Sequence, residues 1–107
     1  KQDFHFNLNG QSEYIEEGFS MMLNGKEILI TTQDSTALTI PTQAFLKQLE
    51  GEDINKPIYD RDKLTLRKTN DLVDVKIIFN SINLKVDVDD QRVINYASGS
   101  VLLKVKK

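Results

Sequence analysis

The chain has 107 residues, of which 39% are hydrophobic and 28% are charged. This composition is typical of one globular domain, residues 1–107, rather than of a disordered segment. The formal net charge of −2 gives no global attraction to nucleic acid or to an anionic membrane. The chain has no cysteine, which excludes a disulfide framework and a thiolate metal site, and no apolar run approaches the roughly 20 residues of a membrane span.

The N-terminal segment from Phe4 to Leu8 alternates apolar and polar residues and predicts a strand. Asn9-Gly10 follows as a turn signal. A three-residue loop at this point would set Phe6 opposite Tyr14 as an aromatic cross-strand pair. We therefore predict an N-terminal hairpin in which the first two strands pair with each other.

The strongest hairpin signal in the chain is Asn24-Gly25, because a type I′ turn needs positive φ at both central residues. With these two residues as the loop, Met21 faces Ile28. Side chains alternate between the faces of a strand, so one face of this hairpin collects apolar side chains and belongs to the core. These side chains are Phe19, Met21, Leu23, Ile28 and Ile30.

A short helix is predicted after Pro41, which forces the preceding residue into an extended conformation. Thr42 is placed to cap a helix of about eight residues. Phe45 and Leu49 fall on one stripe of it and predict docking on a sheet. Gly51 stands where a left-handed residue ends such a helix.

The second half predicts a three-strand meander with two-residue turns at Asn70-Asp71 and Asn80-Ser81. In that register Arg67 opposes Asp74 as an ion pair. One face of the meander is then apolar, from Leu64 and Leu66 through Val73, Val75, Ile77, Phe79, Ile82 and Leu84 to Val86 and Val88. Residues 96–100, YASGS, are predicted as a loop before a last strand at 101–105.

Together these elements predict a mainly β, α+β fold. It is a bent antiparallel sheet of hairpins and the three-strand meander, with one short helix packed on it. The alternative is a β-sandwich or a partial barrel with a helical connection.

Candidates for catalysis are few. His5 is the only histidine, and a serine nucleophile such as Ser98 or Ser100 would need it or a lysine as its base. The alternating pattern places His5 on the outer face of a strand, as an ordinary surface residue. No phosphate-binding glycine loop or dinucleotide fingerprint occurs, so neither an enzyme nor a cofactor is expected.

The densest carboxylate group, Asp87, Asp89 and Asp90, is read as a solvated turn. A calcium loop would need glycine where Arg92 stands. No metal site is therefore predicted.

Lysines provide the candidate binding face. Parity places Lys63, Lys76 and Lys85 on the outer face of the meander, and Lys104 and Lys106 join them if the last strand pairs nearby. Such a patch suits a phosphate backbone. It is also what an ordinary soluble sheet face carries to prevent aggregation.

Two short stretches resemble parts of known families. Residues 38–49, LTIPTQAFLKQL, resemble the strand-to-helix step of small single-strand DNA-binding transcriptional coactivators. Residues 8–18, LNGQSEYIEEG, resemble the opening strands of some bacterial immunoglobulin-like surface modules, a fold from which the helix departs. Each resemblance covers a small part of the chain, and neither assigns a function.

The leading hypothesis is a non-enzymatic binding domain that contacts another protein, or a second copy of itself, through a sheet edge or face. The alternative is a single-stranded nucleic-acid-binding module that uses the lysine-bearing face. An enzyme is the third hypothesis, and it requires His5 or a pair of carboxylates in a cleft.

Overall fold

The computed structural model describes residues 2–9, 13–16, 18–24, 26–32, 37–60 and 62–106. Within these ranges the chain forms strands and one short helix. In chain order they are β1 (Gln2–Asn9), β2 (Glu13–Glu16), β3 (Phe19–Asn24), β4 (Glu27–Thr32), β5 (Ala37–Pro41), α1 (Gln43–Lys47), β6 (Thr65–Thr69), β7 (Val73–Val86) and β8 (Arg92–Val105).

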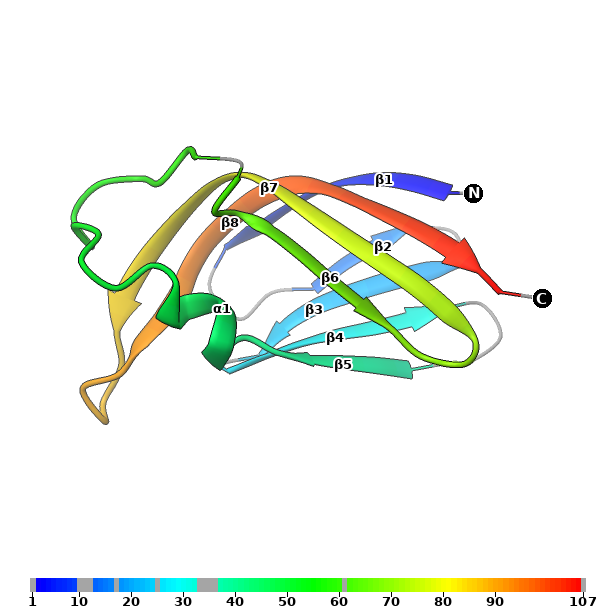
Figure 1. The fold of residues 1–107 in the computed structure, drawn as a ribbon, viewed down its shortest axis with the longest axis horizontal. Coiled ribbons are helices and arrows are strands. Elements are labelled where there is room, and N and C mark those ends of the chain that lie inside the picture. Colours follow the sequence, from blue (N-terminus) through cyan, green and yellow to red (C-terminus); the bar gives the residue numbers. More distant parts are fainter. Residues whose placement is uncertain are drawn as a thin grey trace.

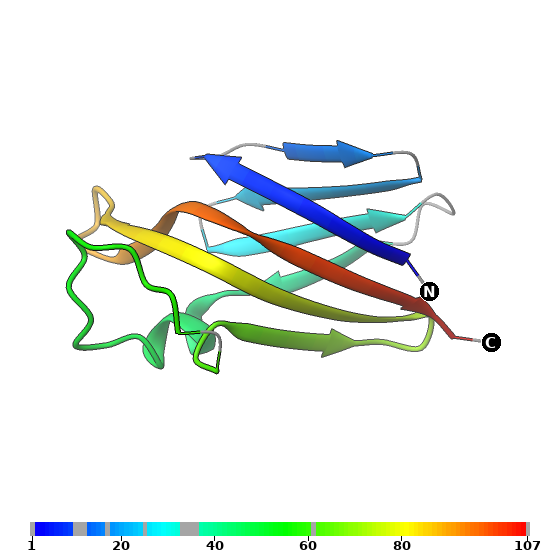
Figure 2. The same ribbon diagram turned by 90° about the horizontal axis from the view of Figure 1, so that it is seen from above.

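The strands form two antiparallel sheets that pack face to face (Figure 1, Figure 2). The first sheet has the strand order β1-β8-β7-β6, and the second has the order β2-β3-β4-β5. The chain returns from the second sheet to the first through α1 and a long loop, which lie together at one end of the molecule (Figure 1). The predicted mainly β class with one short helix is confirmed, and the two layers give the sandwich that the sequence left open as the alternative.

Inward side chains of both sheets form one hydrophobic core, because every second residue of a strand points to the same face. Phe4 of β1 stacks on Phe19 of β3 with ring centroids 4.3 Å apart, which joins the two sheets. Phe79 of β7 meets Phe6 edge to face at 5.7 Å and Phe45 of α1 in a stacked arrangement at 5.4 Å. These rings therefore fix the helix to the first sheet.

The predicted N-terminal hairpin is wrong. β1 pairs along its whole length with β8, from Gln2 opposite Leu103 to Asn9 opposite Tyr96. β2 pairs instead with β3, where Tyr14 lies opposite Met21. A turn signal fixes only where the chain bends, and here the chain passes from one sheet to the other between the two strands.

The hairpin of β3 and β4 keeps its predicted faces in a different register. Asn24 pairs with Glu27 and Met21 with Ile30, whereas the sequence predicted Met21 opposite Ile28. A shift by two residues leaves each side chain on its original face. The predicted core residues of this hairpin are therefore buried, none of them more than 3% exposed: Phe19, Met21, Leu23, Ile28 and Ile30.

The hairpin of β6 and β7 is likewise displaced by one residue from the predicted turn. Its closing pair is Asn70 and Val73, whose backbone N–H and carbonyl are joined at 2.9 Å. Asn70 Oδ1 also accepts hydrogen bonds from the backbone N–H groups of Leu72 and Val73. The asparagine thus precedes the loop and stabilises it with its side chain.

The predicted turn at Asn80-Ser81 is wrong, because β7 continues through both residues. Phe79 pairs with Gly99 and Ser81 with Ser98, so Asn80 is the extra residue of a β-bulge. A bulge and a tight turn both move the inward positions from odd to even residue numbers. The apolar pattern alone therefore does not distinguish them.

The buried face is shorter than predicted. The predicted residues up to Leu84 are buried in the core, except Leu66, which is partly buried against it. Val86 and Val88 are not buried: they are 44% and 101% exposed at the end of the β7–β8 hairpin. The predicted dry face is therefore correct in its first part and wrong at these two positions.

Residues 96–100, predicted as a loop, belong to β8. Gly99 lies between Phe6 of β1 and Phe79 of β7 in the register of the first sheet. A Cβ at Gly99 would lie against the carbonyl oxygen of Ile78 and 2.8 Å from Phe79 Cα. The glycine permits this close approach of β7 and β8 and leaves room for the two phenylalanine rings to meet.

Helix α1 docks as predicted but is shorter than expected. Phe45 and Leu49 are buried, and Gly51 has φ +90° after the following turns. Thr42 precedes the helix without donating or accepting a side-chain cap bond. Its backbone N–H instead donates to the Lys26 carbonyl at 2.9 Å, which ties the helix to the β3–β4 hairpin.

Candidate functional site

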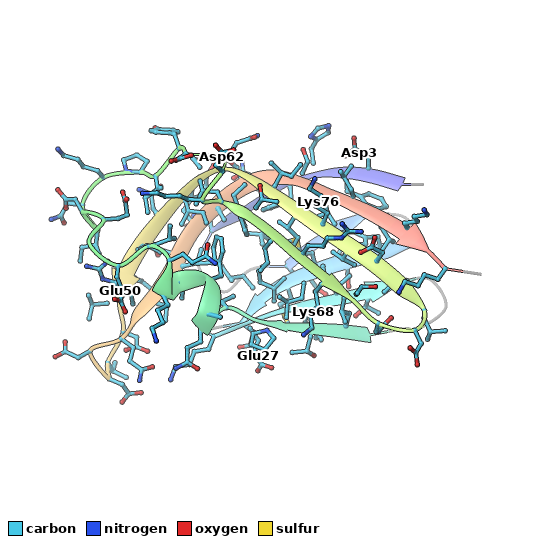
Figure 3. All side chains as sticks on the ribbon, in the orientation of Figure 1. Asp3, Glu27, Glu50, Asp62, Lys68 and Lys76 are labelled. Atoms are coloured by element: carbon cyan, nitrogen blue, oxygen red, sulfur yellow. The ribbon has the colours of Figure 1, made fainter. Side chains whose placement is uncertain are left out.

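The predicted lysine face is only partly assembled. Lys76 of β7 and Lys104 of β8 project from the outer face of the first sheet and line a hollow of about 210 Å³ with Arg67 and Asp74. Lys76 lies on the outside of the sandwich, away from the helix (Figure 3). These residues gather because β6, β7 and β8 are neighbours in the sheet.

Arg67 and Asp74 form the predicted ion pair, with Arg67 Nη2 2.7 Å from Asp74 Oδ2. They lie diagonally, because Arg67 is directly opposite Lys76 and Asp74 opposite Thr69. The hydrogen bond and the charge of Arg67 lower the pKa of Asp74, and the charges of Lys106 and Lys104 lower it further. The same hydrogen bond raises the pKa of Arg67.

The other predicted members of the lysine face do not line this hollow. Lys106 acts on it only through its charge, which lowers the pKa of Asp74. Lys63 lies in the loop before β6 and pairs with Glu52 at 3.2 Å. Lys85 lies opposite Val93, about 30 Å along β7 from Lys76 at roughly 3.3 Å per residue. Lys106 follows β8, and its N–H donates to the Leu72 carbonyl.

Tyr96 is an aromatic residue that was not predicted on the outer face of the first sheet, where Lys76 and Lys104 lie. It lies on β8 opposite Asn83 and beside the buried Ala97, so the alternation directs it outward. It is about 20 Å along β8 from Leu102, the residue opposite Lys76, at roughly 3.3 Å per residue. Because residues 96–100 were predicted as a loop, Tyr96 was not expected on the sheet.

His5 lies on the outer face of β1, as predicted, and is exposed. Its Nδ1 is 3.0 Å from Ser100 Oγ on β8, a contact set by their direct pairing in the sheet. Neither residue lines the hollow beside Lys76 and Lys104. Nucleophilic catalysis also requires donors for the oxyanion and a cleft for the substrate, and this pair lies on a sheet face.

The carboxylates at the β7–β8 turn have a structural role. Asp87 Oδ1 accepts backbone hydrogen bonds from Asp89 and Gln91, each at 2.9 Å. Asp90 has φ +65°, as a tight turn requires. Among the described residues no group of three or more acidic or histidine side chains is arranged to hold a metal ion.

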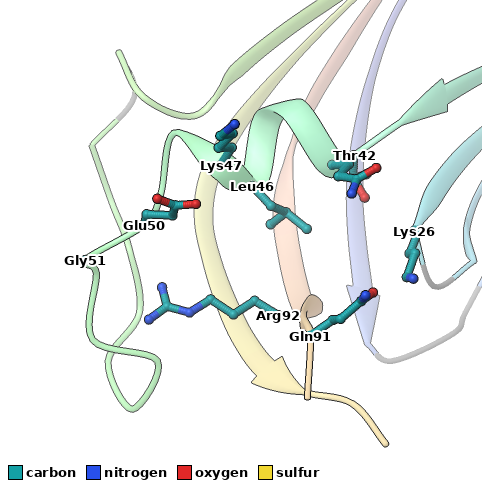
Figure 4. A pocket seen from close by; sticks show the side chains of 9 residues that line it. Lys26, Thr42, Leu46, Lys47, Glu50, Gly51, Gln91 and Arg92 are labelled. Carbon is teal, nitrogen blue, oxygen red and sulfur yellow. The ribbon is translucent and has the colours of Figure 1, made fainter. Parts of the chain in front are cut away.

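A larger hollow of about 510 Å³ lies between α1 and two hairpins, and no sequence signal predicted it. It is lined by Lys26, Thr42, Gln43, Leu46, Lys47, Glu50, Gly51, Gln91 and Arg92 (Figure 4). Lys26 comes from the β3–β4 hairpin, and Gln91 and Arg92 from the start of β8. Only the tertiary structure brings these three segments together.

The walls of this hollow carry an excess of positive charge. Lys26, Lys47 and Arg92 contribute three cations, and Glu50 contributes one carboxylate. Arg92 Nη1 donates to the Leu49 carbonyl at 3.2 Å, which anchors the guanidinium beside α1. Across the part of the chain that the structure describes, none of the three cations forms an ion pair.

One of the lining residues carries a buried polar atom with no hydrogen-bond partner. Thr42 is fully buried, and its Oγ1 has no hydrogen-bond partner among the residues described. An unsatisfied buried hydroxyl costs about 1–3 kcal/mol of stability.

The edges of the sheets are the remaining candidates. β1 and β6 flank the first sheet, and β2 and β5 flank the second. β6 carries Arg67 and Lys68, β5 ends in Pro41, and β2 has four residues. Charge, proline and short length all discourage the pairing of another strand. β1 has eight residues; it carries one charge, at Asp3, and neither charge nor proline from Phe4 to Leu8.

Comparisons with known proteins add no assignment: no protein-family model, no curated protein and no solved structure matches the chain. In the described residues, the one helix is too short to cross a membrane.

Proposed function

We propose that this chain is a non-enzymatic binding domain that takes up an extended segment of another protein as an added strand along the outer edge of β1, from Asp3 to Leu8. The observation that carries the proposal is the regular edge of this strand, on which no described strand pairs opposite β8. Edge strands present backbone N–H and C=O groups to any chain able to pair with them.

The edge of β1 is long and regular. Its register with β8 runs without a bulge from Gln2 to Asn9, and at 3.3 Å per residue it extends for about 26 Å. In the described part of the chain, β1 pairs with β8 alone. Alternate backbone groups of β1 therefore face away from the sheet.

The core holds β1 in place before any partner arrives. Phe4, Phe6 and Leu8 are at most 7% exposed and anchor every second residue of the strand. A preorganised edge loses little conformational entropy when a second chain pairs with it. Binding then orders only the incoming segment.

The outward side chains of β1 indicate the chemistry of the partner. Asp3, His5 and Asn7 lie on the outer face and are exposed. A residue of the added strand directly opposite one of them lies about 5 Å away. A segment that places lysine or arginine opposite Asp3 and polar residues opposite Asn7 therefore suits this edge.

A selection from a library of extended peptides, each about ten residues long, followed by residue-resolved amide hydrogen exchange, tests the proposal. We expect a selected peptide to protect alternate amides of β1, those directed away from β8, and to leave β6 unchanged. A scattering measurement in parallel reports whether a second copy of the chain occupies the edge. Protection that maps elsewhere, or no selected peptide together with a monomeric chain, contradicts the proposal.

A double variant, His5→Lys with Asn7→Lys, supplies the charges that natural edges use against pairing. We expect it to abolish peptide binding. Asn83→Lys, on the inner strand β7 of the same sheet, is the matched control and should leave binding unchanged. Equal losses in both variants would show that the edge is not the site.

The second candidate function, binding of single-stranded nucleic acid, rests on Arg67, Lys76 and Lys104 around one hollow. Binding through phosphates predicts affinity that falls steeply with salt. In oligonucleotide anisotropy titrations at several salt concentrations, the double variant Lys76→Ala with Lys104→Ala should therefore show a weaker dependence of affinity on salt than the wild type. Absence of binding at low salt contradicts this function without affecting the strand-addition proposal.

A further inference from the structure

We infer that the hollow between α1 and the starts of β4 and β8 binds a small organic anion, a carboxylate-bearing molecule, at a site separate from the β1 edge. Its residues come from three segments that the fold brings together (Figure 4). The volume of about 510 Å³ is that of a small-molecule site.

The charge of the hollow selects an anion. Its described lining has three cations against one carboxylate, whereas the whole chain has a formal net charge of −2. A local excess of positive charge in an acidic protein concentrates anions at that place. Lys26, Lys47 and Arg92 are not neutralised by ion pairs with described residues, so their charges are available to a ligand.

The donors are held at the walls. Arg92 is oriented by its bond to the Leu49 carbonyl, and further guanidinium donors remain for a ligand. The bond from Thr42 N–H to the Lys26 carbonyl holds the β3–β4 hairpin against the helix. The bonds position the segments that carry Lys26 and Arg92 on two sides of the hollow before a ligand enters.

One further residue points to an organic anion rather than an inorganic one. Leu46 extends from α1 toward the hollow (Figure 4) and provides an apolar wall for a carbon skeleton. An inorganic anion would use the cations and leave the Leu46 wall without a contact.

The test is an NMR titration of the ¹⁵N-labelled chain with succinate, with its neutral isostere succinamide and with inorganic phosphate. We expect saturable shifts of the Leu46, Gly51 and Arg92 amides with succinate. We expect no binding of succinamide, because it is neutral and forms no charge-assisted bond, and at least about tenfold weaker affinity for phosphate, because it has no carbon skeleton to contact Leu46. Equal affinity for succinamide, or tighter binding of phosphate, overturns the inference.

The variant Lys26→Gln with Lys47→Gln removes two cations without touching the Arg92 anchor. We expect it to weaken succinate at least about tenfold, while Lys104→Gln, an exposed lysine of the first sheet, has no effect. Shifts that persist in the double variant, or that map to the Lys76–Lys104 hollow, contradict the site. Because β1 is untouched, peptide binding at its edge is unaffected by either result.

Discussion

Gly99→Ala is the sharpest test of the architecture, because it adds one methyl group at the closest approach of two strands. The new Cβ would lie against the Ile78 carbonyl oxygen and 2.8 Å from Phe79 Cα. Both obstacles are backbone atoms, which cannot rotate away as a flexible side chain would. The methyl group therefore has to separate β7 from β8 beside the bulge at Asn80 or distort their hydrogen bonds.

Overpacking of this kind costs about 3 kcal/mol. For a domain of this size the total free energy of unfolding is about 5–15 kcal/mol, so the variant loses a large share of it. The corresponding decrease in melting temperature is about 12–24 °C, at 4–8 °C per kcal/mol near 100 residues. Urea unfolding followed by far-ultraviolet circular dichroism measures the change directly.

Gly51→Ala is the matched control. Gly51 has φ +90° and open space around a Cβ, so its cost is conformational only, about 1–2 kcal/mol. We expect Gly99→Ala to destabilise the protein more than Gly51→Ala does. A loss below about 1 kcal/mol at Gly99, or the reverse order of the two variants, would refute the strand register around the bulge.

Three further results are expected. Phe45→Ala removes a ring that joins α1 to Phe79 and should lower the free energy of unfolding by about 3–5 kcal/mol in a denaturant titration; a loss below about 1 kcal/mol would mean that the helix is not docked there. Thr42→Val replaces the unpartnered buried hydroxyl and should raise stability by about 1 kcal/mol; lower stability would show that the hydroxyl has a partner. The pKa of Asp74 is lowered by Arg67, so its contribution to stability is complete above the ordinary value of 3.8 and is lost as pH falls through the lower folded value. Melting curves from pH 5 to pH 2 should therefore show a steeper acid decline in the wild type than in Asp74→Asn, and parallel curves would contradict this assignment.

The local periodicity of the sequence determined which face of its strand each side chain occupies. Met21 and Ile28 are in the core although their predicted register was wrong, because a shift by two residues preserves the face of a strand. Arg67 likewise meets Asp74 in a displaced hairpin, because long side chains reach diagonal neighbours. The docked stripe of α1 and the left-handed Gly51 were also predictable, since both depend on nearby residues only.

Strand partners and the candidate sites depended on the tertiary structure. The apolar pattern around Asn80 fits a turn and a bulge equally, and only the pairing of β7 with β8 decides between them. No sequence signal indicated that β1 would pair with β8 rather than with β2. The pairing partner of β1 depends on contacts between residues that are nearly the whole chain apart. The same long-range packing places Lys26, Lys47 and Arg92 around one hollow. Periodicity reports which way a side chain faces, whereas the neighbour it meets across a sheet or a cavity is set by the packing of the whole domain.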